Sequence, residues 1–186
     1  MKRLPVHVLI LLILFTTACK KSFDKVGLAK QYYEVLNTAN YDKAKELIAD
    51  SLLTTEGDYE MVFSQRDYIN LLKWDAVFEP EYELINIEED QGFIKTIVSQ
   101  TNKRILFLHE SPIVFNQIIR FENDNISSVE TPSYVIFNDS IFSSNREKLL
   151  KWIKQNHPEM KSFIYDQTKK GGQEYLNAIN LYKDAN

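Results

Sequence analysis

Apolar and polar positions follow two different periods along this chain. Near both ends, apolar residues recur every three or four positions, which is typical of amphipathic helices. This period predicts helices at residues 24–37, 41–48, 64–79, 144–156 and 175–182. Two of these helices begin at a serine with an acidic residue three positions later, Ser64 and Ser144, as in a capping box. The Lys-Lys-Gly-Gly segment at 169–172 is typical of a turn.

The middle of the chain is rich in Ile, Val, Phe, Tyr and Thr, which favour strands. Five strands are predicted there, at residues 81–88, 93–101, 104–109, 113–122 and 126–137, with Pro132 interrupting the last. Alternation is clearest at 113–122, where four large apolar side chains and the amide of Gln117 share one face. We expect the face that carries Phe115 to point inward, because the opposite face would bury the charge of Arg120.

Helices followed by antiparallel strands indicate an α+β protein. The stretch LAKQYYEVLNTANYDKAKELIAD, a further helix, and long strands ending at IIRFENDNISSVETPSYVIF resemble the nuclear transport factor 2-like superfamily. The resemblance implies N-terminal helices packed on a strongly curved, mainly antiparallel sheet, which forms a cone with a cavity. It places this domain at residues 25–142 and a C-terminal helical extension at 143–186. Some cone-fold relatives are ketosteroid isomerases with a carboxylate base and an acid donor, but no catalytic residue can be transferred from them.

Residues 1–18 are predicted to be a leader that is removed from the mature protein. A basic start precedes an apolar run at 8–15, far shorter than the ~20 residues of a membrane-spanning helix. The Thr-Ala-Cys segment that ends at Cys19 resembles a bacterial lipoprotein box, with Thr16 where the usual box has leucine. This resemblance implies lipidation of Cys19, the only cysteine, and a lipidated tether at 19–24. The alternative is an ordinary signal peptide that leaves a free cysteine.

Charge and anchoring limit the partners. Removal of the leader would take away two basic residues and no acid, changing the formal net charge from −4 to −6. That balance argues against nucleic acid as a partner. Acyl chains would hold the protein on a membrane of the cell envelope, and Lys20 after the cysteine favours the outer over the inner membrane. A small apolar ligand, another envelope protein and a second copy of the chain remain as partners.

Sequence motifs for common chemistry are missing. The chain has no glycine-rich phosphate loop and no serine nucleophile elbow. His109 and His157 are isolated and have no cysteine partner, so neither a metal nor a cofactor is expected. We expect His109 to lie at a strand end, on the surface or at the sheet edge.

Three residues are candidates for a ligand pocket inside the cone: Tyr33, Trp74 and Gln117, with Asp50 as a further acid. Packing alone would explain Tyr33, and Gln117 is expected to bond the backbone or a tyrosine hydroxyl. The absence of motifs favours a non-catalytic module that binds a ligand or a protein. The alternative is a small-molecule enzyme of the isomerase, dehydratase or hydrolase type. A deep cavity with a carboxylate beside a tyrosine would favour the enzyme, and a cone filled with side chains would favour the binding module.

Overall fold

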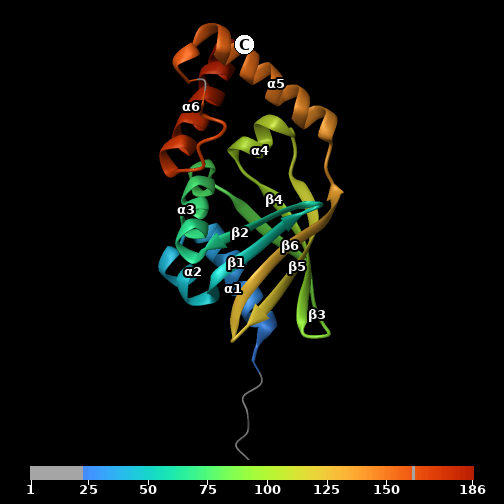
Figure 1. The fold of residues 1–186 in the computed structure, drawn as a ribbon. Coiled ribbons are helices and arrows are strands. Elements are labelled where there is room, and N and C mark those ends of the chain that lie inside the picture. Colours follow the sequence, from blue (N-terminus) through green and yellow to red (C-terminus); the bar gives the residue numbers. More distant parts are fainter. Residues whose placement is uncertain (1–22, 161) are drawn as a thin grey trace, which may run out of the picture.

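The computed structural model describes residues 23–160 and 162–186, so the predicted leader and Cys19 lie outside the described residues. A curved sheet forms the body, with helices along one face and at one end (Figure 1). The helices are α1 (Lys25–Thr38), α2 (Tyr41–Leu47), α3 (Gln65–Asp75), α4 (Lys103–Leu108), α5 (Asp139–Asn156) and α6 (Lys169–Ala185), with the 3-10 turns η1 (Ala76–Phe78) and η2 (Pro158–Met160). The strands are β1 (Ile48–Glu56), β2 (Tyr59–Ser64), β3 (Glu81–Asp90), β4 (Phe93–Thr101), β5 (Ile113–Glu122) and β6 (Asn125–Ile136).

Within the described residues, six strands lie in the order β2-β1-β6-β5-β4-β3, and only β1 and β6 pair in parallel. The pairing of β5 with β6 shifts register opposite Pro132, which lies inside β6 where the break was expected. Such irregularities bend a strand and increase its twist. α1 packs against β3 and β4 on the inner face. The predicted α+β class with a mainly antiparallel sheet is therefore confirmed.

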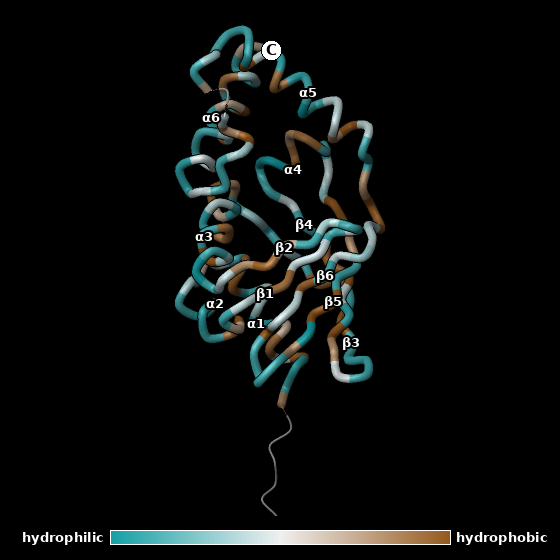
Figure 2. The backbone as a smooth tube through the Cα atoms, in the orientation of Figure 1, coloured by the Kyte–Doolittle hydropathy of each residue, from teal (hydrophilic) through white to brown (hydrophobic). Residues whose placement is uncertain are grey.

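The inner face of β5 carries the predicted side chains. Phe115 and Ile119 are buried there, and Arg120 is exposed on the other face. The Arg120 Nε donates to Glu130 on β6 at 2.6 Å, a partner that the sequence pattern did not reveal. Apolar stretches run through the sheet and along α3 and α6 (Figure 2).

At the sheet, one predicted strand was wrong and one hairpin was missed. The segment 104–109 forms helix α4 instead of a strand, because the buried side chain of Asn102 accepts the Ile105 N–H at 2.7 Å and caps a helical turn. The hairpin of β1 and β2 was not predicted, since apolar and polar residues do not alternate clearly in its strands. β1 joins the sheet by pairing with β6, which is distant in the sequence. A local cap decides the first case, and tertiary pairing outweighs local propensity in the second.

Two predicted boundaries in the C-terminal part were also wrong. α5 begins five residues before Ser144, because the side chain of Asn138 accepts the Ile141 N–H at 3.1 Å and caps it. The glycine-rich segment 169–172 is the first turn of α6 instead of a free turn, capped by Thr168. Its glycines permit close packing on neighbouring backbone: a Cβ on Gly171 would lie 2.0 Å from the Asp166 carbonyl oxygen.

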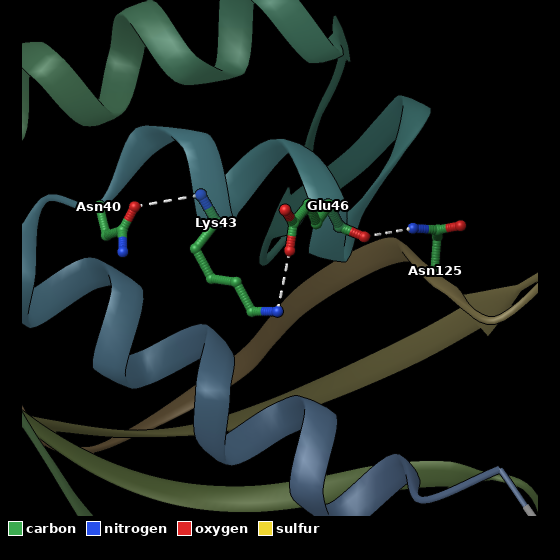
Figure 3. A network of polar contacts seen from close by, with 4 residues as sticks. All are labelled: Asn40, Lys43, Glu46 and Asn125. Carbon is green, nitrogen blue, oxygen red and sulfur yellow. Dashed lines mark hydrogen bonds and ion pairs between the residues drawn. The ribbon is translucent and has the colours of Figure 1, made fainter.

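A polar network joins the helical layer to the sheet near α2 (Figure 3). The Asn40 side chain caps α2 by accepting the Lys43 N–H at 3.1 Å, and the Lys43 ammonium lies 2.9 Å from Glu46. The Asn125 side chain donates to the Glu46 carbonyl oxygen at 2.8 Å, which ties the start of β6 to the end of α2. This bond satisfies one of the carbonyl groups that a helix leaves free at its C-terminus.

Candidate functional site

The inner face of the sheet encloses a cavity of about 350 Å³ with α1 and α3. This volume lies within the usual range of small-molecule pockets, toward its lower end. Eight aromatic side chains line it: Tyr32, Tyr59, Phe63, Tyr68, Trp74, Tyr82, Phe115 and Tyr134. Gln167, in the connection before α6, also lines it, so the C-terminal part of the chain contributes to the wall. The cone is therefore not filled with side chains.

A carboxylate lies beside a tyrosine in this cavity. Asp75 is the last residue of α3, and the Tyr82 hydroxyl donates to its Oδ2 at 3.1 Å. Gln100, which faces Tyr82 across the β3–β4 ladder, donates to the same hydroxyl at 2.7 Å. Burial raises the pKa of Asp75, although the Arg104 charge and the Tyr82 hydrogen bond oppose the rise. A carboxyl group in a cleft whose pKa is raised by burial is a candidate for proton transfer.

A second pair of polar groups lies deeper in the wall. The hydroxyl oxygens of Tyr32, on α1, and Tyr68, on α3, are 2.5 Å apart and both side chains are buried. Burial raises the pKa of both hydroxyl groups, so both stay neutral. The pair joins two helices across the cavity wall and leaves one hydroxyl hydrogen for another acceptor.

One guanidinium group, that of Arg104 on α4, borders the cavity. Its central carbon lies 5.1 Å from the ring centre of Trp74 and 5.7 Å from that of Phe78. The Tyr134 hydroxyl, also in the lining, donates to Glu56 at 2.5 Å. Among the described residues, two acids and one cation thus line a cavity whose wall includes eight aromatic side chains.

Two of the three predicted pocket residues line the cavity, and the third does not. Trp74 and Gln117 line the cavity. Tyr33 is 2% exposed and lies behind the wall, where its hydroxyl donates to Gln117 Oε1 at 2.7 Å and lies 2.8 Å from Thr96 Oγ1. Gln117 thus has the tyrosine partner that was expected, and it also donates to Thr131 at 3.2 Å. Asp50 is exposed on β1 and does not line the cavity.

The expected position of His109 was wrong. It follows helix α4, is 3% exposed, and stacks on the ring of Phe137 at 5.4 Å. Its Nδ1 donates to the Ser111 carbonyl oxygen at 2.8 Å, and its Nε2 accepts the Asn138 N–H at 2.7 Å. Both ring nitrogens are therefore occupied in joining α4 to the start of α5.

Sequence reasoning missed the polar groups of the cavity, namely Asp75, Tyr82, Gln100 and Arg104. The neighbouring Trp74 was a weak signal for Asp75, because both lie at the end of an amphipathic helix. Arg104 was assigned to a strand, so its approach to the cavity was not predictable from that assignment.

No cluster of three or more His, Cys, Asp or Glu side chains suited to a metal ion occurs in 23–160 or 162–186. Within the same ranges, no helix has the length and hydropathy needed to cross a membrane.

Several solved structures share this fold at low sequence identity. A nuclear transport factor 2-like protein of unknown function from Cytophaga hutchinsonii has a TM-score of 0.50 and 15% identity, over 62% of this chain and 93% of its own. A candidate ketosteroid isomerase from Kribbella flavida has a TM-score of 0.50 and 14% identity, over 61% and 78%. A candidate polyketide cyclase from Streptomyces antibioticus has a TM-score of 0.51 and 11% identity, over 67% and 99%. No protein-family model matches the sequence, and no curated protein matches it significantly.

Proposed function

We propose that this protein, which has the nuclear transport factor 2-like cone fold, binds a small molecule with a largely apolar body inside the cone. The observation that carries the proposal is the open, aromatic-lined cavity of about 350 Å³. Ligand pockets are mostly apolar concave sites with a few convergent polar groups, and this cavity has that composition. The proposal includes a lipid anchor at Cys19, which would hold the cone at a membrane of the cell envelope.

Binding can be tested with 2-naphthamide, a neutral planar probe, titrated into the full-length protein in lipid nanodiscs and followed by NMR. Thr54 lines the cavity from β1, so Thr54→Trp should fill it and abolish binding. Val62→Trp is the matched control, because Val62 is 64% exposed on the adjacent β2 and lies outside the lining. Equal affinity of the wild type and Thr54→Trp for the probe would contradict the proposal.

A second function is favoured by one specific observation, the Asp75 carboxyl beside the Tyr82 hydroxyl. This is the arrangement expected of an enzyme, since a buried carboxylate with a raised pKa is suited to removing a proton from carbon. Two of the similar structures carry enzyme names, a ketosteroid isomerase and a polyketide cyclase, which is compatible with acid–base chemistry in this cone.

The enzyme hypothesis can be tested with 2-tetralone, a ketone of similar size to naphthalene, by the rate at which its α-hydrogens exchange with deuterated water. Asp75 would accept the proton, and a tyrosine hydroxyl would hydrogen-bond the enolate oxygen. Asp75→Asn should slow the exchange by about 10²-fold or more, because the amide cannot act as the base. An unchanged rate in Asp75→Asn would reject the enzyme hypothesis and leave the binding proposal intact.

The lipid anchor is tested separately. A fatty-acid probe should label the wild type in cells, and Cys19→Ala should remain unlabelled. Fractionation then distinguishes the outer membrane, which we favour, from the inner one. Equal labelling of both forms would reject lipidation.

A further inference from the structure

Arg104 is the only cationic residue in the cavity lining, within the part of the chain that the structure describes. It has no ion pair within 4.0 Å there, although the adjacent Lys103 on the same helix pairs with Glu79. Its Nε is buried and has no hydrogen-bond partner among the described residues. A partly buried charge without a counter-charge is unfavourable, so a group that supplies the counter-charge would be bound strongly.

The guanidinium is held in place before any ligand arrives. Trp74 and Phe78 both lie within 6 Å of it, and the capped helix α4 fixes its backbone. Arg104 also acts on Tyr175 of α6: burial raises the pKa of the Tyr175 hydroxyl, and the charge of Arg104 opposes this rise. Binding would therefore cost little ordering of this long side chain.

The two acids of the cavity have other partners. Asp75 accepts the Tyr82 hydroxyl, and Glu56 accepts the Tyr134 hydroxyl. Neither acid lies within ion-pair distance of Arg104, although Asp75 is close enough for the charge of Arg104 to lower its pKa. The cavity therefore contains a positioned cation that no acid of its own wall neutralises by direct contact.

We propose that Arg104 binds the carboxylate of the ligand, and that the ligand is an organic acid with a planar apolar body. A guanidinium presents paired donors that match the two oxygens of a carboxylate. The aromatic side chains of Tyr68, Trp74 and Phe115 would contact the apolar body. This inference rests on the proposed binding function and specifies its ligand class.

The test uses two probes that differ in charge and have almost the same shape, 2-naphthoate and 2-naphthamide. Titrations use the full-length protein in nanodiscs, with empty nanodiscs as the blank. The wild type should bind naphthoate more tightly. Arg104→Gln should weaken the affinity for naphthoate by about tenfold or more, and it should change the affinity for naphthamide by less than about twofold. Lys103→Gln is the matched control, because it removes a positive charge from the same helix at a residue that does not line the cavity.

The neutral probe separates the failure of the two proposals. If naphthamide binds the wild type and Arg104→Gln affects both probes equally, Arg104 acts by packing and the assignment of an acid is wrong. If neither probe binds the wild type, the binding function itself fails. Arg104→Lys keeps the charge and is a second variant in case Arg104→Gln does not fold. If Arg104→Lys still binds naphthoate more tightly than naphthamide, the proposal is supported. If a folded Arg104→Gln keeps the full preference for naphthoate, the proposal is overturned.

Discussion

The two buried clusters of this protein are constructed in opposite ways. The first, between α1, α3 and the inner face of the sheet, surrounds an open cavity and contains paired tyrosine hydroxyls. The second lies beneath α5 and α6 and consists of close apolar contacts, with its buried members being Phe78, Leu149, Ile153, Phe163, Tyr175, Ala178 and Ile179. Its aromatic rings meet edge to face, as Phe163 and Tyr175 do at 5.0 Å.

The difference shows how one chain keeps a space open and still folds. Curved strands and rigid tyrosine pairs support the wall of the first cluster, and each buried hydroxyl there needs a partner. The buried members of the second cluster are apolar apart from the Tyr175 hydroxyl, so this cluster supplies stability mainly by packing. We therefore expect substitutions in the second cluster to affect stability most, and substitutions around the cavity to affect binding most.

The largest expected effect is that of Phe78→Ala. Phe78 is fully buried between Trp74 and Tyr175, so its removal leaves a new cavity in a filled cluster. The free energy of unfolding should fall by about 3–5 kcal/mol, measured by equilibrium denaturation. Phe63 borders a space that is already open, so Phe63→Ala should lower the free energy of unfolding clearly less. Equal losses would contradict the distinction between the two clusters.

Gly171→Ala should have the next largest effect. The new methyl group would meet the Asp166 backbone, which cannot move aside as a flexible side chain would. We expect a loss of about 1–3 kcal/mol in the same denaturation experiment, as is typical of overpacking. Asn177→Ala, at an exposed position of α6, should be neutral or slightly stabilising. A neutral Gly171→Ala would show that the close contact at the start of α6 is not a constraint.

Tyr33→Phe should lower the free energy of unfolding by less, about 1–2 kcal/mol. It removes the hydroxyl that donates a hydrogen bond to Gln117 Oε1, and it leaves Thr96 without that partner. Thermal unfolding is a sufficient measurement. Tyr165→Phe, at a residue that is 78% exposed, is the control and should leave stability unchanged. If the two variants behave alike, the hydroxyl network does not support the cavity wall.

The smallest expected effect has the opposite sign and depends on pH. Burial raises the pKa of Asp75 in the folded protein, so the folded state binds a proton that the unfolded state releases. Stability contributed by this group is present below the ordinary carboxyl pKa and is lost as pH rises through the folded pKa. Asp75→Asn should thus be more stable than the wild type at pH 7, and the difference should disappear near pH 3.5. A difference that grows on acidification would show that Asp75 is stabilised as the anion.

The predictions from periodicity succeeded where local signals are strong. α1 was predicted within one residue at both ends and α3 within one residue at its start, since each has an apolar stripe and a side-chain cap. The predicted helix 64–79 runs past the end of α3 at Asp75 and includes the 3-10 turn η1. The strands around 113–122 were also predicted, together with their inner face. α4 was assigned as a strand because its residues favour strands, and only the buried cap at Asn102 reverses that preference.

The sequence by itself determined the α+β class, most helices, the main strands and the inward face of β5, because these follow from spacing within one element. It also identified Gln117 as an inward amide that needs a tyrosine or backbone partner. Only the tertiary structure brought Asp75, Tyr82, Gln100 and Arg104 to one cavity, since they come from α3, β3, β4 and α4. Sequence spacing cannot show such convergence, because it depends on how far the sheet curves and where its helices cross.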